Sequence, residues 1–546
     1  MKNKFFKYYH FLLGSLVLLA SCTKKVDDAF LNPNATTRVP IETLLPGIIG
    51  NFIGSSSAQG SAYGISQDGM YVGRYIQNWE NYVTGSQYDM MGGATGASDV
   101  LGSVWAMHYY GHGQNLSKMI EWGEEEKKWD YVGVGYAVRA WGWLQLTDMY
   151  GEAILKQAFD PTRLVFQYDT QEEIYAEVRR MCHLSLSYLN KTGDNASQAN
   201  LAKGDAYFYN GDVNKWKKFV YTVLARSFHH FTNKSSYNAD SVIFYCNQGI
   251  TTVADMAAAK FANSGITGTS NFYGPLRNNV SSMRQGRFVT DLMTGNLTMF
   301  TGVADPRCAY ILRENTNGTY KGIRPNKGTD ALATADQPQN FWGGTFASIT
   351  APASDANCRY IFKNGSPFPV ITPAETFFMK AEAYYRKGDK ANALTAYTNG
   401  ISLSFDMLTT TADYHSSVPA AKQITSTMKD AYLANTAVVP AAASGLTLSH
   451  IMLQKYIALY GYGFIETWMD MRRFHYTDID PATGNQVYAG FTPPSGVDLY
   501  TNNNGKLVYR ARPRYNSEYL YNVEALKLIG GLDLDYHTKE MWITKP

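Results

Sequence analysis

Residues 372–405 (TPAETFFMKAEAYYRKGDKANALTAYTNGISLSF) decide how the rest of the chain can fold. Thr372 and Glu375 have the spacing of a capping box, and Pro373 falls at the first helical position, where a missing N–H costs nothing. Gly388 then ends the helix, because glycine accepts the left-handed conformation. A second apolar pattern starts directly afterwards. The stretch therefore predicts two helices with a short joint, packed as an antiparallel pair.

The second helix is expected to begin at Asp389, whose side chain suits an N-cap. The apolar faces of the pair follow the tetratricopeptide pattern, in which small residues allow close approach and aromatic rings fill the remaining groove. These positions are Phe377, Ala381, Tyr384 and Tyr385 in the first helix, and Ala393, Leu394, Tyr397, Gly400 and Ile401 in the second. Lys380 and Phe405 depart from the pattern, so an ordinary helical hairpin is the alternative. One pair cannot bury both of its faces, so other pairs must stack on it.

Further helices are predicted wherever apolar residues recur at helical spacing. Thr170 and Glu173 form a second capping box, and Asp212 is expected to cap another helix. The predicted helices cover residues 98–122, 129–150, 169–189, a segment after 212, 420–433 and 448–471. Together with residues 372–405 they make about four pairs, so we expect a mainly α fold, a tetratricopeptide-like helical superhelix with a continuous core.

Three segments lack this periodicity and are rich in Gly, Asn, Thr, Pro and aromatic residues. They lie near residues 60–102, 263–373 and 473–514. Irregular stretches of this length in a compact protein are usually functional. We expect a single domain over residues 35–546 that carries these segments as long loop insertions.

The N-terminus has the features of an export signal. Three lysines within the first seven residues precede the apolar run 11–20, which is too short to span a bilayer. Residues 19–22 (LASC) resemble a bacterial lipobox, so Cys22 is the expected lipidation site after removal of residues 1–21. Residues 22–34 would then form a polar lipidated tether. The alternative is a plain secretion signal followed by chance by a cysteine.

Charge and cysteine usage exclude some functions and leave others open. The chain has 49 basic and 46 acidic residues, and residues 1–21 hold three of the basic ones, which leaves 46 of each. Such a balance gives no support for a nucleic-acid surface. Cys182, Cys246, Cys308 and Cys358 lack zinc-site spacing and do not reveal a pairing, so thiols and bridges both remain open. The 40 tyrosines, 10 tryptophans and 26 phenylalanines are unusual, and such rings suit ligand platforms.

Several motifs, taken in order, resemble the SusD/RagB-like family of outer-membrane nutrient-binding lipoproteins. Beside the lipobox, the matching residues are 137–140 (AVRA), 148–152 (DMYGE), 216–219 (WKKF), 381–384 (AEAY), 454–458 (QKYIA), 466–473 (ETWMDMRR), 514–518 (RYNSE), Asn522 and Trp542. Each motif is short, but their order extends over nearly the whole chain. Met541-Trp542 stands where many relatives carry paired tryptophans, which leaves the helical fold unaffected.

The resemblance implies a non-enzymatic protein that is lipid-anchored at the outer membrane of a Bacteroidetes-type cell and exposed on its surface. Such proteins capture an oligosaccharide, or in some relatives a peptide, and pass it to a SusC-like TonB-dependent transporter. Their repeats face the transporter and their irregular loops hold the ligand. No cofactor is implied, although a structural calcium ion occurs in some relatives. Binding residues vary within the family, so none is transferred to this chain.

Candidate ligand-binding residues are therefore chosen for their chemistry. An aromatic ring can stack on the C–H face of a pyranose while amides and acids bond its hydroxyls. Rings on the glycine-rich segments, with Asn78, Glu80, Asn81, Gln87, Asn271, Gln339 and Asn340 beside them, are Trp79, Tyr82, Tyr88, Phe272, Tyr273, Phe341 and Trp342. The alternative is that these rings only anchor their loops.

Other polar residues are expected to be structural. Glu466, Arg472 and Arg473 suit arginine–carboxylate clamps within the scaffold. His108 and His112 have helical spacing but lack the glutamate of a zinc protease, so a core or surface role is expected. No metal site is assigned.

A calcium loop and two alternative functions are also candidates from the sequence. Asp478, Asp480 and Gly484 resemble a calcium loop, yet Ala489 stands at the position of its essential glutamate. A surface glycoside hydrolase is an alternative function, with Asp68, Asp89, Asp305 or Asp336 as its acids, but the sequence does not pair them. A third possibility is a pure assembly scaffold that binds a barrel and no nutrient.

Overall fold

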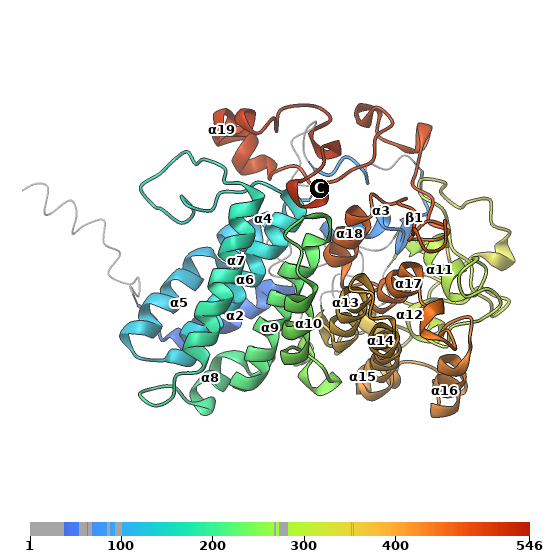
Figure 1. Cartoon of the computed structure of the whole chain (residues 1–546), viewed down its shortest axis with the longest axis horizontal. Coiled ribbons are helices and arrows are strands. Elements are labelled where there is room, and N and C mark those ends of the chain that lie inside the picture. Colours follow the sequence, from blue (N-terminus) through green and yellow to red (C-terminus); the bar gives the residue numbers. More distant parts are fainter. Residues whose placement is uncertain are drawn as a thin grey trace, which may run out of the picture.

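The computed structural model of the chain describes residues 38–53, 63, 68–84, 88–92, 101–266, 269–271, 282–350, 352 and 354–546. The predicted signal peptide and tether, with Cys22, lie outside the described residues, and so do Gln87, Phe272 and Tyr273. The fold is mainly helical, with its elements arranged side by side along the longest axis (Figure 1). Across the described ranges, no helix is long and apolar enough to cross a membrane.

Helices make up most of the described chain. They are α2 (Leu44–Ile53), α3 (Asp68–Tyr75), α4 (Ser103–Ala106), α5 (Gly113–Glu125), α6 (Trp129–Tyr150), α7 (Gln171–Leu189), α8 (Gln198–Asp205), α9 (Val213–His229), α10 (Ala239–Gln248), α11 (Arg287–Met293), α12 (Cys308–Ile311), α13 (Pro373–Arg386), α14 (Lys390–Thr410), α15 (Ala412–His415), α16 (Ser426–Ala434), α17 (Leu448–Ala458), α18 (Phe464–Arg473) and α19 (Val523–Leu528). Two π-helical turns are Met107–His112 and Tyr515–Tyr519.

In the described part of the chain, four short strands form two small antiparallel sheets, and all but β2 lie within the irregular segments. They are β1 (Trp79–Asn81), β2 (Ala257–Ala259), β3 (Met283–Gln285) and β4 (Phe368–Ile371). Strand β1 pairs with β3, with Trp79 opposite Gln285. Strand β2 pairs with β4, which leads into α13. The sheets therefore tie loop segments to the helices.

Helix caps explain where several helices begin. The capping box of α7 is complete, with Thr170 and Glu173 bonding each other's backbone. Asp389 caps α14 as expected, accepting from the Asn392 N–H. The box predicted for α13 forms only by half: Thr372 accepts from the Glu375 N–H, but the Glu375 carboxylate pairs with Arg226 instead of returning to the cap. The carboxylate pairs with Arg226 because a buried arginine without a counter-charge would be strongly destabilising.

The α13–α14 pair packs as predicted, with one correction. Phe378, not Phe377, is the fully buried ring, and it fits against Gly400 of α14, where a Cβ would lie 3.0 Å from it. Tyr397 is fully buried, and its hydroxyl donates to the Val438 carbonyl at 2.7 Å. Ala381 is fully buried as predicted, whereas Phe377, Tyr384 and Tyr385 are only partly buried.

The helices stack in the order of a superhelix, as expected. Successive packed neighbours are α5 and α6, α6 and α7, α7 and α9, α9 and α10, α10 and α13, and α13 with both α14 and α17. In the described part of the predicted helix 98–122, α4, a π-helical turn and α5 follow one another without a gap, so a helix forms there but the π-helical turn within it was not predicted. The prediction of one helix over residues 448–471 is wrong, because α17 ends at Ala458 and α18 begins at Phe464. Gly461, between the two helices, has a φ of +85°.

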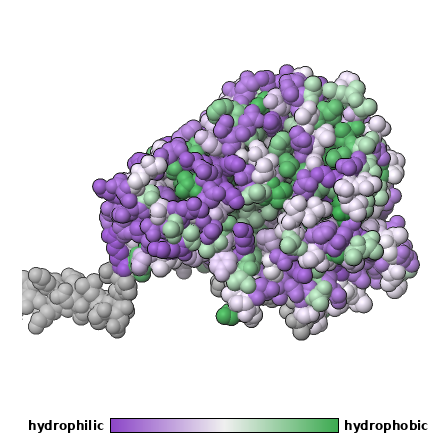
Figure 2. Space-filling view, turned by 90° about the horizontal axis from the view of Figure 1, so that it is seen from below, coloured by the Kyte–Doolittle hydropathy of each residue, from purple (hydrophilic) through white to green (hydrophobic). Residues whose placement is uncertain are grey.

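The top and the bottom of the molecule differ in Figure 1. The C-terminal segment with α19 lies along the top, β1 and α11 lie at the right near mid-height, and α8, α15 and α16 lie at the bottom. Seen from below, the surface is largely hydrophilic, with smaller hydrophobic areas between (Figure 2).

Cys182, Cys246, Cys308 and Cys358 are all buried, and the first three are thiols without a disulfide. Loops and helices share one continuous core from Ile41 to Ile543.

Candidate functional site

Trp79, one of the predicted ligand residues, lies in the core. Its ring makes T-shaped contacts with Phe341, 6.2 Å between centroids, and Tyr460, at 6.1 Å. Its Nε1 donates to the Met70 carbonyl at 3.1 Å, and no part of the residue is exposed. A Cβ at Gly73 would collide with the indole. Neither face of this ring is open to a ligand in the structure.

The neighbouring candidate rings are buried too. Phe341 stacks on Phe362 with centroids 4.5 Å apart and an interplanar angle of 4°. Trp342 is 2% exposed. Tyr88 is buried, and its hydroxyl donates to the Asp498 carbonyl at 3.0 Å. The burial favours the role of loop anchor, the alternative that the sequence left open.

Tyr82 is the one described candidate that remains partly open to solvent. It follows β1, and its ring lies against Phe346, with centroids 5.5 Å apart. The Arg284 guanidinium lies 4.7 Å from the Tyr82 ring centroid. Its polar neighbours Asn78 and Glu80 are buried, and burial raises the pKa of Glu80 well above its ordinary value. Those two groups are therefore not placed at the surface to bond a sugar.

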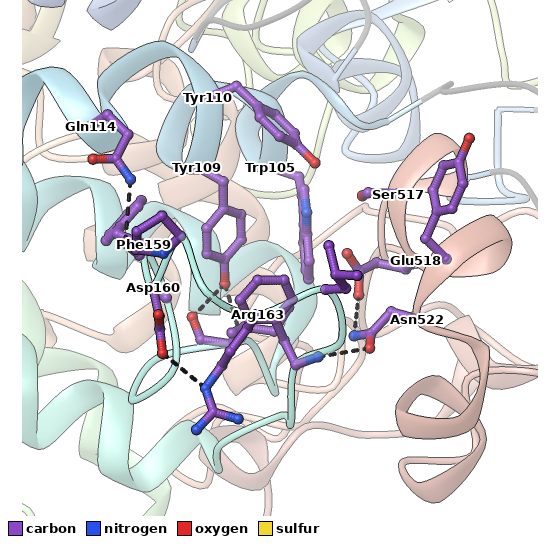
Figure 3. Close-up of a pocket in the computed structure, with 16 residues that line it drawn as sticks. Trp105, Tyr109, Tyr110, Gln114, Phe159, Asp160, Arg163, Ser517, Glu518 and Asn522 are labelled. Carbon is purple, nitrogen blue, oxygen red and sulfur yellow. Dashed lines mark hydrogen bonds and ion pairs between the residues drawn. The ribbon is translucent and has the colours of Figure 1, made fainter. Parts of the chain in front are cut away.

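An open cleft of about 410 Å³ lies elsewhere, and sequence reasoning did not select it. Three segments form it: the π-helical turn 107–112 with α4 and α5, the loop 154–166, and the C-terminal turn 515–522 (Figure 3). Aromatic rings provide its walls, and polar groups lie at both ends. The cleft joins segments that are about 400 residues apart in the sequence.

The floor of the cleft is rigid. Trp105 is 1% exposed and packs edge-on against Tyr150, with centroids 5.1 Å apart. The Tyr109 hydroxyl donates to the Ile154 carbonyl at 2.8 Å and accepts from the Ile154 N–H at 2.9 Å. These two bonds join the loop 154–166 to the helical wall. The aromatic floor is therefore fixed before any ligand arrives.

The rim of the cleft exposes two tyrosines. Tyr110 is 60% exposed and Tyr521 is 73% exposed, and they come from opposite walls. Tyr110 lies on the outer side of the π-helical turn, next to the fully buried His108 and His112. A side-chain phenol offers a flat apolar face with a polar tip. The Arg514 guanidinium lies 5.5 Å from the centroid of the Tyr110 ring, so it partly covers one face of that ring, and both tyrosines keep exposed surface at the rim.

Polar groups close one end of the cleft. The Glu518 carboxylate accepts from the Tyr168 hydroxyl at 2.7 Å and from Asn522 Nδ2 at 2.9 Å. Asn522 Oδ1 in turn accepts from the Phe166 N–H at 3.0 Å. Burial raises the pKa of Glu518 against the opposing effect of these bonds. Although it is only 4% exposed, the carboxyl group lines the cleft, unlike Glu80, and these bonds hold it in place there.

The opposite end is built from the loop 154–166. Asp160 accepts from the Arg163 Nε at 3.0 Å, and Gln114 Nε2 donates to the Phe159 carbonyl at 3.3 Å (Figure 3). The loop can pass close to α5 because Gly113 has no side chain, and a Cβ there would lie 2.7 Å from the Phe159 ring. Asp169 fixes the base of the loop by accepting from two of its backbone N–H groups.

The cleft could not be found from local sequence patterns. Tyr109 and Tyr110 stand in a segment whose periodicity predicts one continuous α-helix, and the π-helical turn changes which side chains point outward. π-Helical turns are frequent at functional sites. Glu518 and Asn522 belong to the motifs shared with the resembling family, but nothing local assigns them to a cleft. The available signal was the density of tyrosines.

Glu466 and Arg473 form a buried ion network, as the sequence predicted. Glu466 accepts from Lys455 at 2.8 Å and from His230 Nε2 at 3.0 Å. Arg473 pairs with Glu382 at 3.0 Å and with Asp470 at 2.6 Å. The prediction that Arg472 pairs with a carboxylate is wrong, because its guanidinium donates to the backbone carbonyls of Asp148 and Tyr509. The ion pairs join α13, α17, α18 and the short turn His230–Asn233 that follows α9.

A group that could resemble a metal site lies in this network. The ligating atoms of His229, His230 and Glu466 all lie within 4.8 Å of one another. His229 already pairs with Glu382 at 2.7 Å, and Lys455 occupies the other side of Glu466. A divalent cation would meet the positive charges that these acids neutralise, so the residues fit an ion network better than a metal site.

The other patterns with a chemical alternative are structural. Asp480 accepts from the Leu448 N–H at 3.0 Å and from the Ala482 N–H at 2.9 Å, so it holds a turn against α17 instead of facing outward. Asp478 pairs with His475 at 2.7 Å. His112 Nε2 lies 3.1 Å from the Ile48 carbonyl, and His108 packs on Trp143, with centroids 4.1 Å apart. Both histidines lie in the core.

Three of the four acids named for a hydrolase are buried in structural bonds. Asp68 accepts from the Val104 N–H at 2.7 Å, and Asp89 accepts from the Tyr500 N–H at 2.7 Å. Asp305 pairs with Arg307 at 2.6 Å. Asp336 is partly exposed at the surface. These carboxylates do not present an open pair across a cleft.

Comparison with known proteins identifies the class. A family model described as SusD-like, starch-binding and associating with the outer membrane, matches residues 33–494. The chain therefore belongs to the SusD-like family. No curated protein sequence matches it.

Solved structures share the fold. A SusD/RagB family protein from Bacteroides thetaiotaomicron matches with a TM-score of 0.68 and 20% identity, over 93% of this chain and 99% of the other. A SusD homolog from Bacteroides fragilis matches with a TM-score of 0.68 and 16% identity, over 93% of this chain and 100% of the other. A chitin-binding SusD homolog from Flavobacterium johnsoniae matches with a TM-score of 0.61 and 16% identity, over 92% and 98% of the two chains. The resemblance seen in the sequence motifs and the predicted helical fold are confirmed.

Proposed function

We propose that the protein is a non-enzymatic cell-surface lipoprotein that captures oligosaccharides and delivers them to a SusC-like TonB-dependent transporter. The observation that carries this proposal is the aromatic cleft of Figure 3, in a chain whose family is described as starch-binding. A sugar ring would stack on Tyr110 or Tyr521, and its hydroxyls would bond Glu518 and Asn522. A relative that binds chitin is consistent with a glycan ligand.

The ligand class is tested with the soluble chain that lacks residues 1–21 and carries Cys22→Ser. A glycan array and a peptide array are probed in parallel, and positive ligands are measured by calorimetry. We expect glycan binding without cleavage of the ligand on long incubation. Binding to peptides alone would show that the ligand is a peptide and not a glycan. Release of shorter sugars would show that the protein is a hydrolase.

Lipid anchoring at Cys22 supports the surface location. Cys22→Ala should leave the fold unchanged and release the protein from the outer-membrane fraction, because acyl chains contribute about 0.8 kcal/mol per buried CH₂. Metabolic labelling with a fatty acid should mark the wild-type protein and not the variant. Equal labelling of both would contradict anchoring at this residue.

Delivery to a transporter predicts a physical complex. Outer membrane solubilised in mild detergent should yield the protein together with a TonB-dependent barrel. Recovery of the lipoprotein alone, with the barrel present in the same extract, would contradict this part of the proposal and would favour capture without direct transfer.

A further inference from the structure

A second surface pocket, of about 460 Å³, has a different chemistry from the cleft. It shares no lining residue with the cleft of Figure 3. Its walls come from the loop that contains Gln339 and Gly343, from residues 356–359, and from residues 416–419 after α15. Arg313 and Arg359 lie at its base. The pocket is therefore polar and positively charged where the cleft is aromatic.

Arg313 carries a buried charge without an acidic partner. It is 4% exposed, and its Nη1 donates to the Asn357 carbonyl at 3.1 Å while its Nη2 donates to Gln339 Oε1 at 3.0 Å. Its Nε has no hydrogen-bond partner, and no ion pair joins it to a carboxylate in the part of the chain that the structure describes. Burial, with the nearby charge of Arg359, lowers the pKa of Arg313 to about 10. The group is still charged at neutral pH.

The surrounding charges do not balance that cation. Arg359 pairs with Glu314 at 3.0 Å, and Lys422 pairs with the same carboxylate at 2.5 Å. These two cations outweigh burial and lower the pKa of Glu314 to about 2, so it stays ionised. Arg359 and the 42% exposed Lys422 thus share the one carboxylate of Glu314, and none of its ion pairs extends to the buried Arg313. A buried cation in excess of its counter-charges is costly unless an anion completes the site.

The guanidinium is fixed in orientation, which an oxyanion site requires. The two hydrogen bonds to Asn357 and Gln339 set its plane, and the loop backbone passes so close that a Cβ at Gly343 would collide with Nη2. Gly343 has a φ of +83°, a conformation that other residues rarely adopt. Ser416 and the Asn357 side chain are exposed at the rim. Such a fork, with neighbouring donors, matches the geometry of a carboxylate or sulfate.

We propose that this pocket binds the anionic oxygen group of an acidic oligosaccharide, the carboxylate of a uronic acid or a sulfate ester, through Arg313 and Arg359. The inference rests on the proposed glycan-binding function and adds the charge class of the ligand. A neutral sugar would leave the excess positive charge uncompensated. An acidic unit would neutralise it while other units of the chain remain outside the pocket.

The test compares ligands on the wild-type protein, so that it does not depend on the folding of a variant. Calorimetry is performed with a short oligogalacturonide, with its methyl ester and with a sulfated galactan oligosaccharide, at low and high salt. We expect the acid or the sulfate ester to bind about tenfold more tightly than the methyl ester, with the preference weakened by salt. Which of the two anionic ligands binds identifies the oxyanion.

Two variants locate the site. Arg313→Gln should remove the preference for the anionic ligand, and its melting temperature is measured alongside. Arg287→Gln is the matched control, because the Arg287 side chain is 52% exposed and pairs with Asp291 outside the pocket. A preference that survives in a folded Arg313→Gln protein would overturn the assignment.

The outcomes separate the two proposals. Equal binding of the acid and its methyl ester, with glycan binding intact, would overturn the acidic-ligand inference and leave the proposed function standing. Binding of neutral glycans only would do the same. Absence of binding to every oligosaccharide, on the array and in calorimetry, would overturn both.

Discussion

Two groups of aromatic residues in this protein have opposite environments. Trp79 and Phe341, on glycine-rich loops, are 0% and 2% exposed, while Tyr110 and Tyr521 at the cleft are 60% and 73% exposed. The first group holds loops onto the helical core, and the second stands open on a rigid floor. A glycine-rich sequence around a ring therefore does not make that ring a ligand platform. Exposure depends on tertiary packing, since loops on a large scaffold need anchors of their own.

The largest expected loss of stability is at the scaffold. Tyr397→Ala should reduce the free energy of unfolding by about 3–5 kcal/mol, because it empties a fully buried site and removes the bond to the Val438 carbonyl. Tyr397→Phe is the control and should cost about 1 kcal/mol, the value of the hydrogen bond alone. Chemical denaturation measures both. Equal losses in the two variants would show that the ring does not fill the space as described.

Trp79→Ala extends the comparison to the loops and should also cost roughly 3–5 kcal/mol, since large buried rings leave cavities when truncated. An exposed tryptophan on a loop would instead lose little free energy of unfolding when truncated. The same denaturation experiment checks it, with Tyr82→Ala, at a partly exposed position three residues further along the chain, as the matched variant. A loss below about 1 kcal/mol at Trp79 would place its ring at the surface and restore it as a ligand candidate.

The buried ion network predicts a pH-dependent contribution from His230. Burial opposes its charged form, but Asp148 and Glu466 outweigh burial and raise its pKa from 6.5 to about 9. Because the folded pKa is raised, the stabilisation is fully present below about pH 6.5 and is lost as pH rises through about 9. His230→Gln should therefore destabilise by up to roughly 3 kcal/mol at pH 6 and by much less at pH 9.5.

Melting curves of wild type and His230→Gln across that pH range measure the difference between the two proteins, in which the other titrations cancel. A difference that stays constant with pH would show that His230 is neutral in the folded state. A difference that grows with pH would show that its pKa is lowered.

The smallest effect on stability is expected at the cleft. Tyr110→Ala and Tyr521→Ala should each change the free energy of unfolding by less than about 0.5 kcal/mol, as exposed substitutions do. Each should weaken glycan binding about fivefold, which corresponds to a stacking contribution of about 1 kcal/mol. Tyr207→Ala, at a ring that is 54% exposed outside the cleft, is the control. If all three variants weakened binding equally, the effect would be non-specific and would not locate the ligand in the cleft.

Much of the fold could be predicted from the sequence because it depends on local rules. Helix α6 has the predicted limits, Trp129–Tyr150, and Asp212 and Asp389 cap helices where expected. The errors arise where tertiary contacts override local pattern. Glu375 leaves its capping box to pair with Arg226, and a π-helical turn interrupts the segment 98–122.

The candidate sites could not be predicted in the same way. The cleft joins Tyr110 to Tyr521, and the polar pocket joins Arg313 to Arg359 and residues 416–419, so each depends on long-range contacts. No local spacing encodes such contacts. The sequence did indicate that aromatic rings matter, but the burial of Trp79 and the exposure of Tyr110 result from tertiary packing.

The most direct test of the central claim measures affinity and stability on the same proteins. Wild type, the Tyr110→Ala/Tyr521→Ala double variant and Trp342→Phe are titrated calorimetrically with a glycan selected on the array, and their melting temperatures are recorded. We predict at least a tenfold loss of affinity at an unchanged melting temperature for the double variant, and wild-type affinity for Trp342→Phe. Unchanged affinity in the double variant, together with lost affinity in a folded Trp342→Phe protein, would contradict the account.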